Sequence, residues 1–132
     1  MSENLELLRR NLKGFRETGE LQAQRFSDDF VWDMSQFRGW PERPTYEGVE
    51  GTQVFLRDWA EAWEDWSLEA VDYREVDDRV IGVMRQVGRS KLSGLEVDMT
   101  FAQVWTFRDG QITRMTMYAD ADEAFEAVGL TA

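Results

Sequence analysis

The sequence predicts one α+β domain, and three observations support this fold class. The 132 residues suit a single domain with a substantial core. Apolar residues recur at helical spacing near the N-terminus and alternate near the C-terminus, as in a half-buried sheet. The expected order is helices, a strand, a helix and a strand meander, without repeat or linker. We therefore expect residues 1–132 to form one domain.

The composition excludes several classes of function. Fifteen Lys and Arg against 26 Asp and Glu give a net charge of −11, which disfavours nucleic acid and anionic membrane as partners. The absence of cysteine excludes disulfides, thiol nucleophiles and thiolate metal sites. Because histidine is also absent, acid–base chemistry would need a carboxylate, tyrosine or lysine with a shifted pKa. We expect no metal and no cofactor, and a cytoplasmic protein, since no leader or long apolar run is present.

Three helices and one short helical segment are predicted. Leu5, Leu8, Leu12 and Phe15 share one helical face, and Gly19 suits the end of that helix. A short helix is expected over 20–26, although Gln22 and Gln24 weaken its pattern. A third helix is expected over 49–63, with Phe55, Trp59 and Trp63 as a stripe of the kind that usually faces a core. Asp120 or Asp122 is expected to cap a closing helix, and Asp120 has Glu123 at capping-box spacing.

Alternation predicts the strands. Phe30, Trp32 and Met34 share one face of a strand that follows Asp28 and Asp29. Residues 36–48 contain both prolines and read as a surface loop. Its Trp40 and Tyr46 either seal the edge of the core or form a flap over a pocket. Further strands are expected over 68–76, 80–89, 94–107 and 111–119, and the inward side of 80–89 is left open because it is apolar on both faces.

The last two strands decide which side chains share the buried face. A two-residue Asp109-Gly110 turn would set Phe101 and Gln103 beside Thr116 and Tyr118, whereas a three-residue loop would set them beside Met115 and Met117. We prefer the three-residue loop, because it gives one continuous apolar face and a slip would break it. That face comprises Met99, Phe101, Trp105, Phe107, Met115, Met117 and Ala119, with Gln103 as its single amide.

The chain resembles the nuclear transport factor 2-like superfamily, and within it the SnoaL-like group. The resemblance rests on five segments in order: TGEL (18–21), FSDDFVWD (26–33), YEGVEG (46–51), FRDGQI (107–112) and YAD (118–120). It implies a cone-shaped, curved mixed sheet wrapped around the N-terminal helices, the cystatin-like α+β barrel, with a pocket in its concave face. Relatives include ketosteroid isomerases, polyketide cyclases, dehydratases and epoxide hydrolases, and others only bind ligands or proteins. The fold alone therefore does not settle the function.

The catalytic residues of these relatives mostly do not carry over. The resemblance puts the isomerase base at Met34, its oxyanion tyrosine at Leu12 and its partner acid at Gln103. Only the Gln103 amide can still donate a hydrogen bond to an oxyanion. The epoxide hydrolase pattern needs acids and an arginine pointing inward, but we place Asp98 and Arg114 on the outer face. Asp120, an aspartate shared with many relatives, serves more simply as a helix cap.

We therefore predict a pocket for a small apolar, polyketide- or steroid-like molecule, with no identifiable catalytic residue. Its expected lining is Trp32, Met34, Tyr46, Phe55, Trp59, Met99, Phe101, Gln103, Met115 and Met117. One alternative is an isomerase, lyase or polyketide cyclase, which needs a carboxylate near the cavity. Another is a non-catalytic interaction module with a solid cone. The mixed outer face, with Thr100, Thr116 and Tyr118, suits the interface of a homodimer.

Overall fold

The structure is a computed structural model that describes residues 3–18, 20, 22, 25–37, 40 and 43–129. The elements in chain order are α1 (Glu3–Thr18), β1 (Phe26–Asp33), β2 (Thr45–Glu47), α2 (Gly48–Glu61), β3 (Trp63–Val76), β4 (Arg79–Ser90), β5 (Glu96–Arg108), β6 (Gln111–Tyr118) and α3 (Ala121–Ala127).

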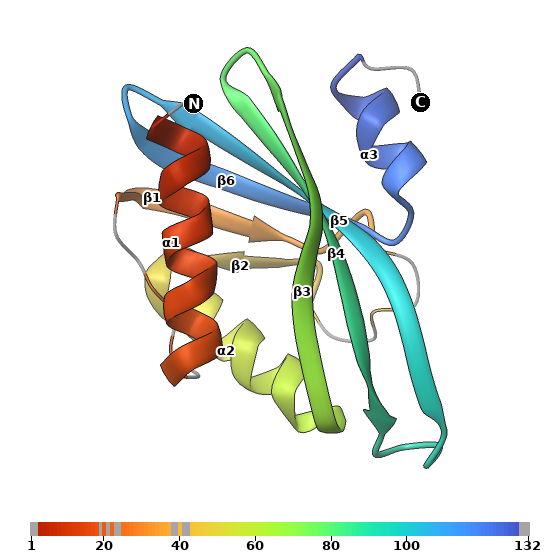
Figure 1. Cartoon of the computed structure of the whole chain (residues 1–132). Coiled ribbons are helices and arrows are strands. Elements are labelled where there is room, and N and C mark those ends of the chain that lie inside the picture. The colour runs from red at the N-terminus through yellow and green to blue at the C-terminus, as the bar shows by residue number, and fades with distance from the viewer. Residues whose placement is uncertain are drawn as a thin grey trace.

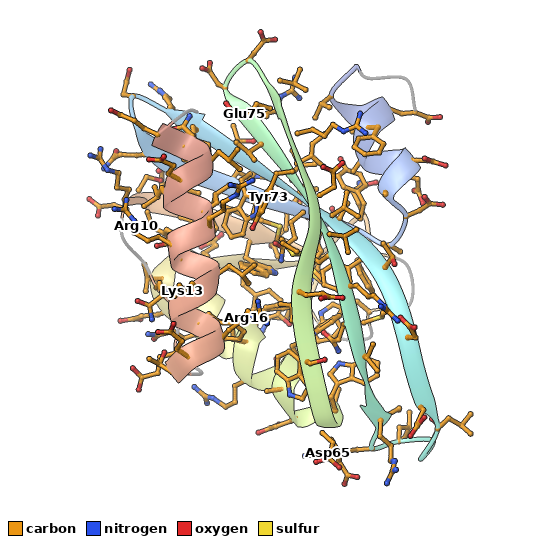
Figure 2. The ribbon with its side chains drawn as sticks, in the orientation of Figure 1. Arg10, Lys13, Arg16, Asp65, Tyr73 and Glu75 are labelled. Atoms are coloured by element: carbon orange, nitrogen blue, oxygen red, sulfur yellow. The ribbon has the colours of Figure 1, made fainter. Side chains whose placement is uncertain are left out.

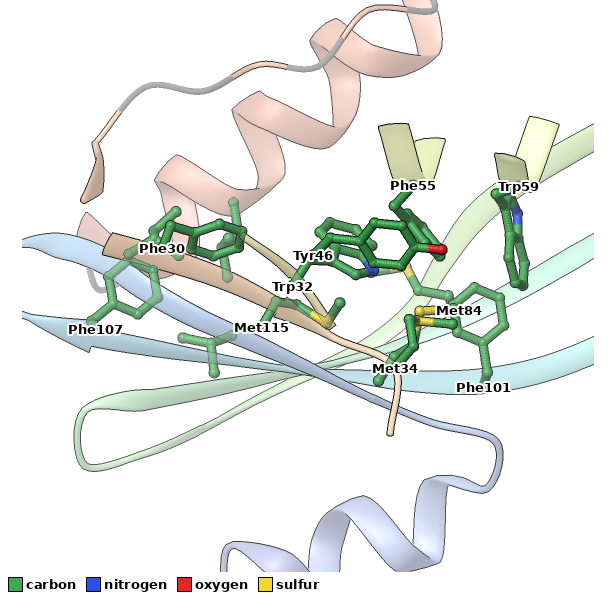
Figure 3. Packing of buried hydrophobic residues seen from close by; sticks show 14 of the residues in the cluster. Phe30, Trp32, Met34, Tyr46, Phe55, Trp59, Met84, Phe101, Phe107 and Met115 are labelled. Atoms are coloured by element: carbon green, nitrogen blue, oxygen red, sulfur yellow. The ribbon is translucent and has the colours of Figure 1, made fainter. Parts of the chain in front are cut away.

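The six strands of the described chain form one open, strongly curved sheet in the order β2-β1-β6-β5-β4-β3 (Figure 1). β1 and β6 run parallel and every other neighbouring pair is antiparallel. α1 and α2 lie over the concave face, and α3 lies on the other side (Figures 1 and 3). This is the α+β class with a curved mixed sheet that the sequence predicts.

α1 forms where the sequence predicts it, with Leu7 and Leu8 buried against the sheet. Glu3 and Glu6 in its first turn and Arg16 in its last turn complement the helix dipole. The expected stop at Gly19 lies outside the described residues. The short helix expected over 20–26 is wrong at every described position, because Glu20, Gln22 and Arg25 are not helical and Phe26 already begins β1. Arg25 has a φ of 64°, which ends any helix before the strand.

Two other boundaries differ from the prediction. α2 ends at Glu61, and Trp63 begins β3 instead, because it pairs with Ser90 of β4. The segment expected as a loop contains β2, whose Tyr46 pairs with Trp32 of β1 and is only 1% exposed. Tyr46 therefore belongs to the core. Trp40 donates a hydrogen bond from its indole Nε1 to the Tyr46 hydroxyl at 3.3 Å.

The β5–β6 hairpin has the predicted inward face but neither the predicted turn nor the predicted register. The three-residue loop would set Gln103 opposite Met115, whereas in the structure Gln103 lies opposite Met117 and Trp105 opposite Met115. Arg108 pairs directly with Gln111, so the loop is the two-residue Asp109-Gly110 turn, and both residues have positive φ angles of 52° and 77°. A bulge between the Thr106 and Phe107 pairings then shifts the register by one residue. The three-residue loop is thus wrong, and the turn and the bulge together set the pairing two residues away from the expected one, which keeps the same side chains facing inward.

The structure also decides which way β4 faces. Val80, Met84 and Gln86 point to the concave side, while Ile81 and Val83 pack on the outer side. There they form a second small core with Ala102, Val104, Ala124 and Val128 under α3. As predicted, Asp120 caps α3, since its Oδ1 accepts a hydrogen bond from the Asp122 backbone N–H at 2.9 Å.

Candidate functional site

One part of the concave face is filled by aromatic side chains (Figure 3). The ring centroids of Phe55 and Trp59 lie 5.7 Å apart, and Trp59 lies 5.8 Å from Phe101. Tyr46 packs edge-on against Phe55 at 5.4 Å, and Trp40 lies over Trp59 at 5.5 Å. The Trp59 Nε1 also donates to the buried Gln86 Oε1 at 2.8 Å. These contacts make this region a packed core.

A cavity of about 90 Å³ remains between α1 and the sheet. α1 supplies one wall, β1 and β3–β5 supply the floor, and Leu56 of α2 closes one side. The described lining residues are Leu8, Asn11, Leu12, Phe15, Gln22, Phe26, Trp32, Leu56, Leu68, Tyr73, Met84, Gln103 and Trp105. The lining is mostly apolar, with a few polar groups from different elements.

The structure brings two of the ten predicted site residues, Trp32 and Gln103, into the wall of this cavity. The other eight pack in or against the core beside it. Seven of them are at most 6% exposed: Met34, Tyr46, Phe55, Trp59, Phe101, Met115 and Met117. Met99 is partly buried against the same cluster.

Sequence reasoning missed the wall that α1 contributes. Leu8, Asn11, Leu12 and Phe15 are spaced by three, one and three residues, so they share one helical face. The residue that could have indicated this wall is Asn11, because a helix that only packs on a core does not need an amide in its apolar stripe. Leu68 and Tyr73 were missed because the pattern of β3 is loose, and a bulge near Ala70 interrupts it.

The polar groups of the wall are neutral hydrogen-bonding groups. Gln103 is 9% exposed, and its Oε1 accepts a hydrogen bond from the Trp105 Nε1 at 3.3 Å. The Asn11 Nδ2 and the Trp32 Nε1 are buried and find no acceptor among the described residues. Buried donors without partners are uncommon and costly, so a bound molecule that accepts a hydrogen bond from either group would be stabilised.

Tyr73 is the one titratable side chain among the described lining residues. Burial raises the pKa of its phenol, and the positive charge of Arg9 offsets only part of that effect. The Arg9 guanidinium of α1 lies 5.3 Å from the centre of the Tyr73 ring, and Figure 2 shows Tyr73 between β3 and α1. Tyr73 therefore stays protonated at neutral pH and can donate a hydrogen bond. The described lining contains no carboxylate, so it offers no strong base.

Asp98 and Arg114, both expected on the outer face, do lie there. Asp98 is exposed and forms a two-pronged ion pair with Arg85, at 2.8 and 2.6 Å. Arg114 donates to Asp33 Oδ2 at 2.6 Å, with Asp33 buried and Arg114 half in water. Neither Asp98 nor Arg114 lines the cavity.

Two further findings concern the described part of the chain as a whole. It contains no group of three or more side chains arranged to hold a metal ion. None of its helices combines the length and the apolar character that crossing a membrane would require.

Comparison with solved structures gives the same fold. TerC, crystallised with polyporic acid, is 25% identical, with a TM-score of 0.73 over 96% of this chain and 98% of TerC. A nuclear transport factor 2-like protein of unknown function from Burkholderia pseudomallei is 18% identical, with a TM-score of 0.77 over 98% and 99% of the two chains. A protein with a ketosteroid isomerase-like fold from Catenulispora acidiphila, in complex with trimethylamine, is 17% identical, with a TM-score of 0.61 over 82% and 79%.

A search of curated protein sequences gave no match. The sequence model of the SnoaL-like domain matches residues 11–115, which include α1 from Asn11 onward and almost the whole sheet. Most residues of the cavity wall therefore lie inside the matched segment. The chain belongs to the SnoaL-like domain family.

Proposed function

We propose that this protein binds a small, largely apolar molecule in the cavity between α1 and the sheet. The observation that carries the proposal is the cavity wall itself, which is apolar apart from neutral polar groups, those of Asn11, Gln22, Trp32, Tyr73, Gln103 and Trp105. Such a wall suits an apolar molecule with an acceptor oxygen, which the unpartnered donors can bind. TerC, at 25% identity, was crystallised with a small molecule, and this likeness supports the same class of function.

The size of the cavity adds a condition. About 90 Å³ is less than the roughly 150 Å³ of a cavity that takes up benzene, and far less than a typical ligand pocket of about 300 Å³ or more. A polyketide- or steroid-sized molecule would therefore have to displace part of the wall. α1 is the element that can yield, because it lies across the sheet without hydrogen-bonding to its ladder.

In this proposal Trp32 and Gln103 contact the ligand directly. The remaining eight predicted residues pack in or against the core beside the cavity. They would contact the ligand only if this core rearranged around it. Met34, Met99, Met115 and Met117 suit that role, because methionine side chains adapt their shape at low cost.

A second candidate is catalysis of the isomerase, lyase or cyclase kind. The observation that favours it is the protonated Tyr73 in the same wall as the Gln103 amide. Two such donors can stabilise a developing oxyanion. The base would have to come from the bound molecule or from water, since the described lining supplies none. Turnover of a bound probe, followed by mass spectrometry, would favour this candidate over simple binding.

We also propose that the protein forms a homodimer through the outer face of β3–β5. α3 covers the part of that face around Ile81 and Ala102. The part around Val87, which is 40% exposed, stays open and mixes apolar, hydroxyl and charged side chains. A mixed composition of this kind suits a protein interface, because interfaces as a whole are about as polar as the rest of a protein surface.

The binding proposal is tested by titrating the protein with N-phenyl naphthylamine, a neutral apolar fluorescent probe, and with polyporic acid as a competitor. Leu68→Phe places a ring in the cavity without a large overpacking cost, because the space is empty. We expect it to weaken binding at least tenfold while the melting temperature stays near that of the wild type. Leu92→Phe, at a 99% exposed position, is the matched control and should change neither quantity.

A second pair of variants tests the polar group. Gln103→Leu should weaken binding of an oxygen-bearing ligand about tenfold, the loss expected when a buried hydrogen bond is removed. Gln111→Leu, on the exposed hairpin end, is its control. Equal binding by the wild type and Leu68→Phe would show that the probe sits elsewhere and would refute the proposal.

A further inference from the structure

Of the surface hollows that share lining residues with the cavity, two lie around Phe15 and Trp66 at the C-terminal end of α1. The first, of about 590 Å³, shares Phe15 and Leu56 with the cavity, and its other lining residues are Glu20, Gln53, Arg57, Ala60 and Trp66. The second, of about 330 Å³, shares Phe15 and Leu68 with the cavity and adds Arg16, Trp66 and Ser67. Phe15 thus borders all three spaces, and Trp66 borders both surface hollows.

Phe15 and Trp66 therefore stand where the cavity meets the surface. Their ring centroids lie 6.4 Å apart with the planes tilted by 45°, so they touch without interlocking. Phe15 comes from the last turns of α1 and Trp66 from the start of β3, and no backbone hydrogen bonds tie these two elements together. A shift of Phe15 would join the cavity to the two hollows into one space that is large enough for a metabolite.

Two arginines line the hollows around this pair. Arg16 lines the second hollow and Arg57 the first, and neither forms an ion pair with any residue that the structure describes. They share this with other described arginines such as Arg10 and Arg79, whereas Arg74, Arg85, Arg89 and Arg114 pair with carboxylates. Glu20 is the one acid in the first hollow, and the second hollow has none among its described residues. Figure 2 shows Arg16 on the side of α1 that faces β3, whereas Arg10 projects away.

We infer that the ligand of this protein is an elongated molecule with an anionic end, such as a carboxylate or sulfonate. Its apolar part enters the cavity past Phe15 and Trp66, and its anionic end stays in the hollows, bound by Arg16 and Arg57, which line them. This inference rests on the proposed binding function and adds the charge of the ligand and its direction of entry. Arginine suits the role because its fork of N–H donors matches an oxyanion.

The test compares two probes that share one ring system. Anilinonaphthalene sulfonate carries an anionic group, and N-phenyl naphthylamine is the same scaffold without it. Titrations by fluorescence use the full-length wild type and the variants Arg16→Gln, Arg57→Gln and Arg10→Gln. All three variants remove one positive charge, so the long-range field changes equally in each.

We expect the sulfonate probe to bind the wild type more tightly than its neutral twin, in spite of the net charge of −11. Arg16→Gln should weaken the sulfonate probe about fivefold and Arg57→Gln somewhat less, and both should leave the neutral probe unchanged. Arg10→Gln should affect neither probe. Added salt should weaken the sulfonate probe alone, because it screens charges near the surface.

The outcomes separate this inference from the function on which it rests. Binding of the neutral probe to the wild type but not to Leu68→Phe would support the pocket. If the sulfonate probe then binds no more tightly than the neutral probe, or if Arg16→Gln has no more effect than Arg10→Gln, the anionic end is refuted and the pocket stands. If neither probe binds, or Leu68→Phe blocks neither, the pocket itself is refuted. Sulfonate binding that survives Leu68→Phe but is lost in Leu92→Ser would assign the signal to the exposed hairpin and would also overturn the inference.

Discussion

Asp33 is the one buried acid among the described residues. Only 6% of it is exposed, and its carboxylate accepts hydrogen bonds from the Ser35 backbone at 2.8 Å and from Arg114 at 2.6 Å. Burial by itself would raise the pKa of Asp33, but the hydrogen bonds from Ser35 and the Arg114 charge outweigh it, so the pKa lies below its ordinary value. The pair joins β1 to β6, the only parallel neighbours in the described sheet.

Replacing Asp33 with Asn should lower the free energy of unfolding by about 1 kcal/mol, since solvent around Arg114 screens part of the lost interaction. Urea denaturation followed by tryptophan fluorescence measures this. Asp98→Asn removes the same charge from the exposed pair with Arg85, and we expect it to behave like the wild type. An equal loss in the two variants would mean that burial of Asp33 contributes nothing.

The same substitution should change the response to acid. Because the folded-state pKa of Asp33 is lowered, its contribution is fully present above its unfolded pKa of about 3.9 and is lost as the pH falls through the folded value. The stability difference between the wild type and Asp33→Asn should therefore be constant near neutral pH and close below about pH 4. If the wild type and Asp33→Asn still differed in free energy of unfolding well below pH 4, the difference would not come from the ionised carboxylate of Asp33.

At the scale of elements, the hairpin shows what alternation can predict. The pattern of β5 and β6 specifies which side chains face inward, and the structure confirms that Trp105, Met115 and Met117 do so. The three-residue loop would set Gln103 opposite Met115, whereas the two-residue turn with its bulge sets Gln103 opposite Met117. Because a shift of two residues keeps the same side chains inward, alternation cannot tell the two arrangements apart, although Asp109-Gly110 is the usual pair for a tight turn. Burial thus fixes the inward face but neither the register nor the type of turn.

The candidate site was less predictable for a related reason. Alternation says that Met115, Met117 and Phe101 point into the cone, but it does not say whether they fill it. They belong to the same buried cluster as Trp59 and Tyr46 and do not line the cavity, whereas the space that remains depends on how far α1 stands from the sheet. That distance is set by contacts between distant segments, such as Phe15 with Trp66, which one sequence does not reveal. Gln103 was found because a single amide in an apolar face is conspicuous.

Gly88 of β4 offers an element-scale test of the entrance. A Cβ at this position would lie 2.6 Å from the Trp66 Cβ and 3.1 Å from its Cα, so β3 can approach β4 here only because glycine has no side chain. Gly88→Ala should cost about 1–3 kcal/mol and displace Trp66. Chemical denaturation gives the cost, and binding of the naphthylamine probe should change with it.

Val87→Ala is the neighbouring control. Val87 faces the outer side of the same strand and is 40% exposed, so its truncation should cost clearly less and leave probe binding unchanged. If Gly88→Ala left both stability and binding as in the wild type, the close approach of β3 and β4 at Trp66 would not constrain the entrance.

At the scale of the whole molecule, the two faces of the sheet have different surroundings. The concave face carries α1, α2, the aromatic core and the cavity, whereas α3 covers only one end of the outer face. The uncovered end contains Val87 and Thr100 around the Arg85–Asp98 pair. A net charge of −11 acts on any partner that approaches this face, including a second copy of the chain.

The proposed homodimer should therefore depend on salt in a particular direction. Two copies with a net charge of −11 repel each other, so raising sodium chloride from about 20 to about 200 mM should increase the dimer fraction in sedimentation velocity. An interface held mainly by ion pairs would weaken instead.

Val87→Glu should shift the population to monomer, because it places an unpaired charge in the interface. Leu92→Glu adds the same charge at the 99% exposed hairpin tip and should leave the dimer intact. A monomer at every salt concentration would rule out this interface, because high salt screens the repulsion between the two copies and a dimer should then form.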